Sequence, residues 1–225
     1  MASSIKIYRF LPANWALKAI QDRCLKISRL NELNDPFEWH IGVRSSNENH
    51  HLIGRDAIDA FLSRLNERFG IICFSNRASD PVIWSHYSEG HKGIALEFEH
   101  EPSDSLVEVK YISDLPTFDV DELRNSGFDQ AYTQSVLEKS FGRKSPSWSY
   151  EHEYRLHYDL SSDDCHMDGE SYFTKISDNF LSKVILGLRC PISESDVDRS
   201  LNQGGFTGVE IVRAKKSDSA YEITY

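Results

Sequence analysis

The feature that most constrains this chain is an alternation of apolar and titratable side chains from Glu151 to Tyr158, from which only His152 departs. Successive residues of a β-strand point to opposite faces of a sheet, so the apolar side chains of Tyr154, Leu156 and Tyr158 share one face. The other face carries the titratable side chains of Glu151, Glu153, Arg155 and His157. We therefore expect a strand here. Its charged face is either a solvated outer face, which is the commoner case, or the wall of a cleft.

Short runs that alternate, or that are wholly apolar, predict strands along the rest of the chain. The expected strands lie at residues 5–10, 25–27, 71–75, 94–99, 107–111, 151–158, 183–188, 209–214 and 222–225. The clean alternation in residues 94–99 and 107–111 predicts that each of these strands buries only one face. The centre of the chain is therefore expected to be a sheet.

Helices are expected between these strands. Asn14 and Ser193 are suitable N-cap residues, and apolar residues recur at helical spacing from about Gly54 to Phe69, before a stop at Gly70. Residues from about Phe128 to Phe141 also have a helical pattern.

One short helix has the clearest start signal in the sequence. Asp80 is a favourable N-cap, and Pro81 fits the first turn, where a missing backbone N–H does no harm. Trp84 and Tyr87 are three residues apart and therefore lie on one side of this helix. Gly90 and the nearby Gly93 are expected to end it.

The chain has 225 residues, enough to bury a full hydrophobic core and few enough to make one domain the default. Hydrophobic residues make up 40% of it, which is typical of a globular protein. We predict a single α+β domain over residues 1–225, with a central, mainly antiparallel sheet, either continuous or split, flanked by helices.

Composition also excludes several classes of protein. A formal net charge of −10 opposes strong non-specific binding to nucleic acid, because that binding depends on Lys and Arg neutralising phosphates. Neither a membrane-spanning segment nor a secretory signal is evident, so we expect no membrane association and a cytoplasmic location. The four cysteines lack Cys-x-x-Cys spacing, which predicts reduced thiols, and we expect no metal site.

Several motifs together resemble a widespread bacterial family of unassigned function. They are Tyr8-Arg9-Phe10, Asn34-Asp35-Pro36-Phe37-Glu38, Cys73-Phe74-Ser75, Trp84-Ser85-His86-Tyr87 and Trp148-Ser149-Tyr150-Glu151-His152-Glu153-Tyr154-Arg155. The resemblance covers nearly the whole chain. In the order and setting of its motifs, that family is in turn similar to the ADP-ribosyltransferase superfamily, which implies a fold of that kind.

The superfamily's signature is an Arg or His on the first strand, a Ser or Tyr in the middle of the fold and a late Glu, which one branch places in Glu-x-Glu. Carried onto this sequence, the resemblance implies catalytic roles for Glu153 and Glu151. It implies NAD-binding roles for Arg9, Ser75, Tyr87 and Arg155. This chain departs from the pattern in two ways: Asn76-Arg77 follows Ser75 in place of the usual Thr-Ser, and serine-branch and tyrosine-branch features are mixed.

The implied roles match the chemistry of the residue types. A carboxylate at Glu153 would stabilise the positive charge that develops on the ribose of NAD, and Glu151 would position or deprotonate the incoming nucleophile. Guanidinium groups at Arg9 and Arg155 would hold the diphosphate. The ring of Tyr87 would stack on nicotinamide, and the hydroxyl of Ser75 would support the site.

Three functions remain open at this point. The first is an NAD-consuming enzyme that transfers ADP-ribose to a macromolecule or hydrolyses NAD, as a bacterial toxin or antiphage effector with an antitoxin or immunity protein as a candidate partner. The second is a metal-dependent nuclease or phosphate-ester hydrolase, which would use His86 together with Glu151, Glu153 and Arg155. The third is a non-catalytic module that binds a nucleotide or a partner.

Purely structural roles also remain open for the same residues. Glu153 can simply pair with Arg155 on its own strand face, Arg9 can be a surface arginine, and Tyr87 can be a core aromatic. The turn around Pro36, with Asn34, Asp35 and Glu38, either contacts a substrate or is fixed by its own side chains.

Overall fold

The computed structural model describes residues 4–101, 105–122 and 141–225. The strands are β1 (Ile5–Leu11), β2 (Cys24–Arg29), β3 (Gly42–Arg44), β4 (Phe69–Ser75), β5 (Ile94–His100), β6 (Leu106–Glu108), β7 (Lys110–Tyr111), β8 (Thr117–Asp119), β9 (Arg143–Lys144), β10 (Glu153–Asp159), β11 (Cys165–Asp168), β12 (Ser171–Lys175), β13 (Leu181–Leu186), β14 (Glu210–Arg213), β15 (Lys215–Lys216) and β16 (Ile223–Thr224). The α-helices are α1 (Ala13–Asp22), α2 (Glu48–Arg68), α3 (Pro81–Tyr87) and α6 (Glu194–Gln203), and the 3-10 helices are η1 (Leu30–Glu32) and η2 (Pro146–Glu151). The expected helix at residues 128–141 lies outside the described residues, apart from its last position.

The fold is α+β, as predicted, and its main sheet is largely antiparallel. Eight strands run in the order β11-β12-β2-β4-β1-β5-β13-β14. Strand β10 joins the same ten-stranded sheet by pairing with β4, and β6 pairs with β10. Pairing between β13 and β14 is parallel, whereas the other described pairs of this sheet are antiparallel.

The main sheet is split beside β4. Strand β1 pairs with β4 only at Tyr8 and Ser75, near one end of β4, although it pairs with β5 along its whole length. At the other end of β4, Gly70 and Ile71 pair with β2 instead. On its opposite edge β4 pairs with β10 throughout. Strands β1 and β2 therefore diverge next to the middle of β4, which leaves backbone groups there available to side chains.

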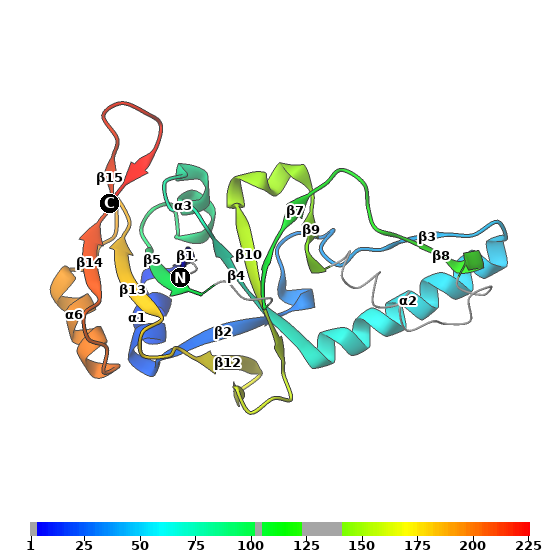
Figure 1. Cartoon of the computed structure of the whole chain (residues 1–225), viewed down its shortest axis with the longest axis horizontal. Helices are drawn as coiled ribbons and strands as arrows, with labels where there is room; N and C mark the ends of the chain where they lie inside the picture. Colours follow the sequence, from blue (N-terminus) through cyan, green and yellow to red (C-terminus); the bar gives the residue numbers. More distant parts are fainter. Residues whose placement is uncertain (1–3, 102–104, 123–140) are drawn as a thin grey trace.

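Helices cover both faces of the sheet around β1, β5 and β13 (Figure 1). On one face, Ile20 of α1 and Val197 of α6 belong to the same buried cluster as Ile7 and Leu96. On the other face, Trp84 of α3 is fully buried in a second cluster. Because both faces are covered, the central strands are buried and hold the position of α3 firmly.

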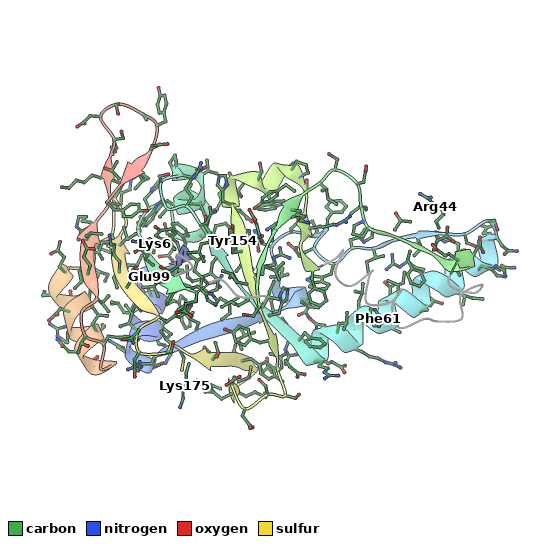
Figure 2. All side chains as sticks on the ribbon, in the orientation of Figure 1. Lys6, Arg44, Phe61, Glu99, Tyr154 and Lys175 are labelled. Atoms are coloured by element: carbon green, nitrogen blue, oxygen red, sulfur yellow. The ribbon has the colours of Figure 1, made fainter. Side chains whose placement is uncertain are left out.

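Helix α2 extends away from the main sheet, alongside β3 and β8 (Figure 1). Its Ile58 packs with Ile41 in a separate small cluster, and Phe61, labelled in Figure 2, packs nearer the sheet. This arm therefore has its own apolar contacts and lies apart from the core under β1.

Two predicted helix boundaries were wrong. Asn14 does not cap α1, because the helix already begins at Ala13 and the carbonyl of Pro12 accepts its first backbone bond from Ala16. Helix α2 begins well before Gly54, at Glu48, because the side chain of Asn47 accepts bonds from the next backbone N–H groups. Its first turn is polar, so apolar spacing could not reveal it.

Glycines near two predicted helix ends have other roles. Gly70 does not stop α2, because it already lies in β4; a Cβ atom there would approach Ile27 Cγ2 to 2.5 Å, so this glycine permits close packing of β2 on β4. Helix α3 ends at Tyr87, before Gly90, whose φ of 64° belongs to the turn that follows.

The two alternating segments in the middle of the chain also differ from expectation. Residues Ile94 to Phe98 are all buried, so β5 does not present one solvated face. Buried Glu97 is satisfied by the ammonium group of Lys6 at 2.9 Å and the hydroxyl of Ser182 at 3.2 Å. Alternation reported the polarity of these residues but not their exposure. The expected strand at 107–111 is divided into β6 and β7, because the segment changes partner: β6 pairs with β10, whereas β7 pairs with β9.

Candidate functional site

A cavity of about 190 Å³ lies at the split in the sheet. Its lining includes Arg9 of β1, Ser75 at the end of β4, Tyr87 at the end of α3, Glu151 at the end of η2 and Glu153 at the start of β10. These are five of the six residues that the sequence singled out. Residues from five separate elements therefore converge on one concave site.

The backbone explains how two carboxylates reach the same wall of this cavity. Glu153 is the first residue of β10. Glu151 was predicted to lie on the same strand, but it is the last residue of η2. Between them His152 adopts a left-handed conformation, with φ of 44°, which ends the 3-10 helix and begins the strand. Both carboxylates are buried, at 4% and 3% exposure, so the charged face of β10 is not a solvated outer face here.

Lys144, which sequence reasoning did not single out, joins the two carboxylates. Its Nζ atom lies 2.6 Å from Glu151 Oε2 and 3.2 Å from Glu153 Oε2. A third carboxylate, that of Glu38, lies 3.6 Å from the same atom. Lys144 lies in a polar stretch, residues 143–149, and the two-residue strand β9 brings it to the wall of the cavity by pairing with β7. Only that long-range pairing reveals its role.

Arg155 lies beneath the cavity and does not line it. The guanidinium is fully buried and donates to Glu153 at 2.8 and 3.1 Å, to Glu38 at 2.6 Å and to the carbonyl of Phe141 at 3.1 Å. These bonds direct its donors to protein groups, so the geometry favours a role in holding Glu153 over contact with a diphosphate. Glu153 and Arg155 do form an ion pair, which the sequence left open, and this pair belongs to a larger buried cluster.

The surrounding charges keep Glu153 ionised. Burial by itself would raise the pKa of this carboxyl group, but Arg155 and Lys144 outweigh burial and lower its pKa to about 2. The backbone N–H of Glu153 also donates to the hydroxyl of Tyr111 at 2.8 Å, which fixes the start of β10. The site thus presents a fixed, charged carboxylate to the cavity.

Glu151 has a different environment from its neighbour. Burial raises its pKa, although Lys144 acts in the opposite direction. The hydroxyl of Tyr87 donates to Glu151 Oε1 and accepts a bond of 2.7 Å from the side-chain amide of Asn34. Burial, followed by the charge of Glu151, raises the pKa of Tyr87, which keeps the phenol protonated. The two carboxylates therefore have pKa values shifted in opposite directions.

Arg9 stands in the split between β1 and β4. One of its terminal nitrogens, Nη1, donates to the carbonyl of Cys73 at 2.7 Å. Within the described part of the chain, its guanidinium forms no ion pair with a carboxylate. Arg9 therefore retains donors that an anionic ligand can use.

Ser75 lines the cavity, but its hydroxyl is engaged locally. It donates to the carbonyl of Arg77 at 2.9 Å and accepts a bond from the Arg77 N–H at 3.1 Å. This small turn fixes the end of β4. The backbone pairing of Ser75 with Tyr8 and Glu153 then joins the three strands at the cavity.

Other residues weighed from the sequence lie elsewhere. Trp84 is a core residue whose indole N–H donates to Ala78, whereas His86 is exposed, bonds to Tyr150 and does not line the cavity. Asp35 caps its own turn by accepting a bond from the N–H of Phe37. Glu38, from the same turn, does line the cavity; its carboxylate pairs with Arg155 and Lys144 in the buried cluster, and burial raises its pKa.

The described residues also bear on two broader classes of function. Residues 4–101, 105–122 and 141–225 contain no set of three His, Cys, Asp or Glu side chains arranged to hold a metal ion. In the same ranges, no helix has both the length and the apolar character needed to span a membrane.

Comparison with known proteins yields one match. No curated protein and no solved structure matches this chain. A family model does match residues 83–156, and this segment supplies Tyr87, Lys144, Glu151 and Glu153 to the site. The predicted resemblance to a family of unassigned function is therefore confirmed: over residues 83–156 this chain matches the family described as protein of unknown function (DUF2971).

Proposed function

We propose that the cavity binds the nicotinamide-ribose end of NAD and that the protein is an NAD-consuming, ADP-ribosyltransferase-like enzyme. One observation carries this proposal: Arg9, Ser75, Tyr87, Glu151 and Glu153, which the resemblance implies as site residues, all line a single cavity. They come from elements spread over most of the chain, so their convergence is not a consequence of nearness in sequence.

The chemistry of the two carboxylates supports the same reaction. When the bond between the ribose C1′ and the nicotinamide nitrogen breaks, the bonding electron pair leaves with nicotinamide and positive charge develops on the ribose. The carboxylate of Glu153, held ionised by Arg155 and Lys144, stabilises that charge. A water or acceptor hydroxyl then bonds to C1′, and Glu151, whose pKa is raised, accepts its proton.

Arg9 and Tyr87 supply the remaining contacts in this proposal. The Arg9 donors that have no partner in the described part of the chain suit a diphosphate oxygen. The ring of Tyr87 lines the cavity, and its hydroxyl is anchored by Glu151 and Asn34, so the ring is held in one place for stacking on nicotinamide.

The test is consumption of labelled NAD by the purified protein, with and without cell lysate, measured as nicotinamide release and as label transferred to macromolecules. We expect activity in the wild type and a loss of at least about a hundredfold in Glu153→Gln, because the stabilising charge is removed. Glu99→Gln is the matched control, since Glu99 is exposed on β5, does not line the cavity and is labelled in Figure 2. Absence of NAD turnover in every sample would refute the proposal.

The proposal includes a cytoplasmic role as a bacterial toxin or antiphage effector. An active NAD-consuming enzyme depletes the NAD of the cell that contains it. Expression of the wild type should therefore slow growth, whereas expression of Glu153→Gln should not. Co-expression of a neutralising protein would restore growth. Equal growth with the two forms would contradict this role without excluding the reaction itself.

The other functions predict different results in the same assays. A metal-dependent hydrolase would cleave nucleic acid or a phosphate ester in the presence of a divalent cation and would ignore NAD. A binding module would bind NAD or ADP-ribose and turn over neither.

A further inference from the structure

A second cavity shares Arg9 with the candidate site. It encloses about 590 Å³ and is lined by residues of β1, α1, β2, β11 and β12. Arg9 is the one residue that lines both this cavity and the smaller one beside Glu153, as far as the described residues show. Arg9 therefore forms part of the wall of both cavities.

The volumes of the two cavities indicate which part of a ligand each of them can hold. Sites for small molecules and cofactors typically enclose roughly 300–1,000 Å³. The smaller cavity, at about 190 Å³, is below this range and fits only part of a dinucleotide. The larger cavity, at about 590 Å³, is within the range and fits a nucleoside.

The lining of the larger cavity matches the chemistry of a purine nucleotide. Trp15 of α1 lines it with 63% of its surface exposed, which is unusual for so large an aromatic residue, and Phe173 of β12 adds a second ring. Exposed aromatic rings stack on nucleic-acid bases, since every base presents a π-face.

The charges of the larger cavity locate the anionic part of such a ligand. Lys18 and Lys26 line the cavity but already pair with Asp22 and Glu32. Arg9, by contrast, has no carboxylate partner within the described residues. A phosphate group is therefore expected beside Arg9, between the two cavities, and not deep in the larger one.

We propose that the two cavities form one elongated site for a dinucleotide whose halves are joined by a diphosphate. The purine nucleoside half occupies the larger cavity and stacks on Trp15, the diphosphate lies against Arg9, and the second ring with its ribose enters the smaller cavity. This inference rests on the proposed function and specifies the ligand class and the residues that bind its far half.

Binding of AMP, ADP-ribose and nicotinamide mononucleotide to the full chain, measured by calorimetry, tests this assignment without requiring turnover. In Trp15→Ala we expect AMP and ADP-ribose to bind at least about fivefold more weakly, because base stacking on the ring is lost. Nicotinamide mononucleotide should bind Trp15→Ala and wild type equally. Tyr221→Ala, which removes a fully exposed ring outside both cavities, should change none of the three affinities.

The outcomes separate this inference from the proposed function. Equal affinity of wild type and Trp15→Ala for ADP-ribose, or failure of the wild type to bind AMP at millimolar concentration, overturns the inference even if NAD is consumed. Trp15-dependent binding of AMP and ADP-ribose in a protein that consumes no NAD supports the inference and refutes the proposed reaction.

Discussion

Lys144 and Glu151 form a buried ion pair at the wall of the cavity, with 2.6 Å between Nζ and Oε2 and side-chain exposures of 4% and 5%. The same ammonium group also approaches Glu153 and Glu38. A single lysine therefore balances three carboxylates together with Arg155. This arrangement explains how three acidic groups can be buried side by side. Substitution of Lys144 should therefore affect both the stability of the fold and the function of the site.

Lys144→Met should destabilise the fold by about 3–5 kcal/mol, because breaking a buried ion pair leaves carboxylates without their compensating charge. The midpoint of urea unfolding, followed by circular dichroism, measures this effect. Lys18→Met is the control: Lys18 and its partner Asp22 are exposed on α1, so the midpoint should not change. Equal unfolding midpoints for Lys144→Met and wild type would show that the cluster is not stabilised by this lysine.

The depressed pKa of Glu153 predicts a specific dependence of stability on pH. Its pKa of about 2 in the folded protein lies below the ordinary value of 4.5. Stability from the ionised carboxylate is therefore fully present above pH 4.5 and is lost as the pH falls toward 2. We expect Glu153→Gln to be less stable than the wild type near neutral pH, with a difference that shrinks below pH 4.5.

Unfolding free energies of the wild type and Glu153→Gln at several acidic pH values test this prediction. Burial raises the pKa of Glu38 and Glu151, whose contributions therefore have the opposite sign, but both proteins retain these groups. A difference in unfolding free energy that stays constant from pH 5 to pH 3 would argue against an ionised, paired Glu153.

His157 should weaken the fold in mildly acidic solution. Burial, with a smaller effect of Arg155, lowers its pKa to about 4 from an ordinary value of 6.5, and its buried Nε2 has no hydrogen-bond partner among the residues that the structure describes. Because the unfolded chain binds the proton more readily, stability falls as the pH drops from 6.5 toward 4. His157→Phe removes this proton site and should keep about 1–2 kcal/mol that the wild type loses by about pH 5.

Thermal or urea unfolding at two pH values, one near 7.5 and one near 5, measures this effect. His166→Phe serves as the control, because His166 is exposed on β11. If both variants lost stability between the two pH values as the wild type does, the buried imidazole would not be the source of the pH dependence.

Tyr87→Phe removes the hydroxyl that joins Asn34 to Glu151. A lost hydrogen bond to a charged, buried group destabilises a protein by about 1.5–3 kcal/mol, and we expect a loss of this size in the unfolding free energy. Tyr221→Phe, at a fully exposed position, should leave it unchanged. A wild-type unfolding curve for Tyr87→Phe would indicate that water replaces the hydroxyl and that the contact does not stabilise the site.

Much of the local structure could be predicted because it depends on neighbouring residues alone. Asp80 and Ser193 cap α3 and α6 as expected, because a cap needs only a side-chain oxygen and the next backbone N–H groups. Alternation likewise identified β10, whose Tyr154 is labelled in Figure 2, since a period of two is a local property of an extended chain. The α+β class followed from these elements.

The burial and the ion pairing of the charged side chains at the site could not be predicted from local patterns. The sequence marked Glu151, Glu153 and Arg155 as titratable, but only the packing of β9, the turn at Glu38 and the split beside β4 decides that they are buried and paired. Lys144 carried no local signal, because its partners come from other segments of the chain. Local patterns report the geometry of neighbouring residues, whereas the charge state of a site depends on groups that only the tertiary structure brings together.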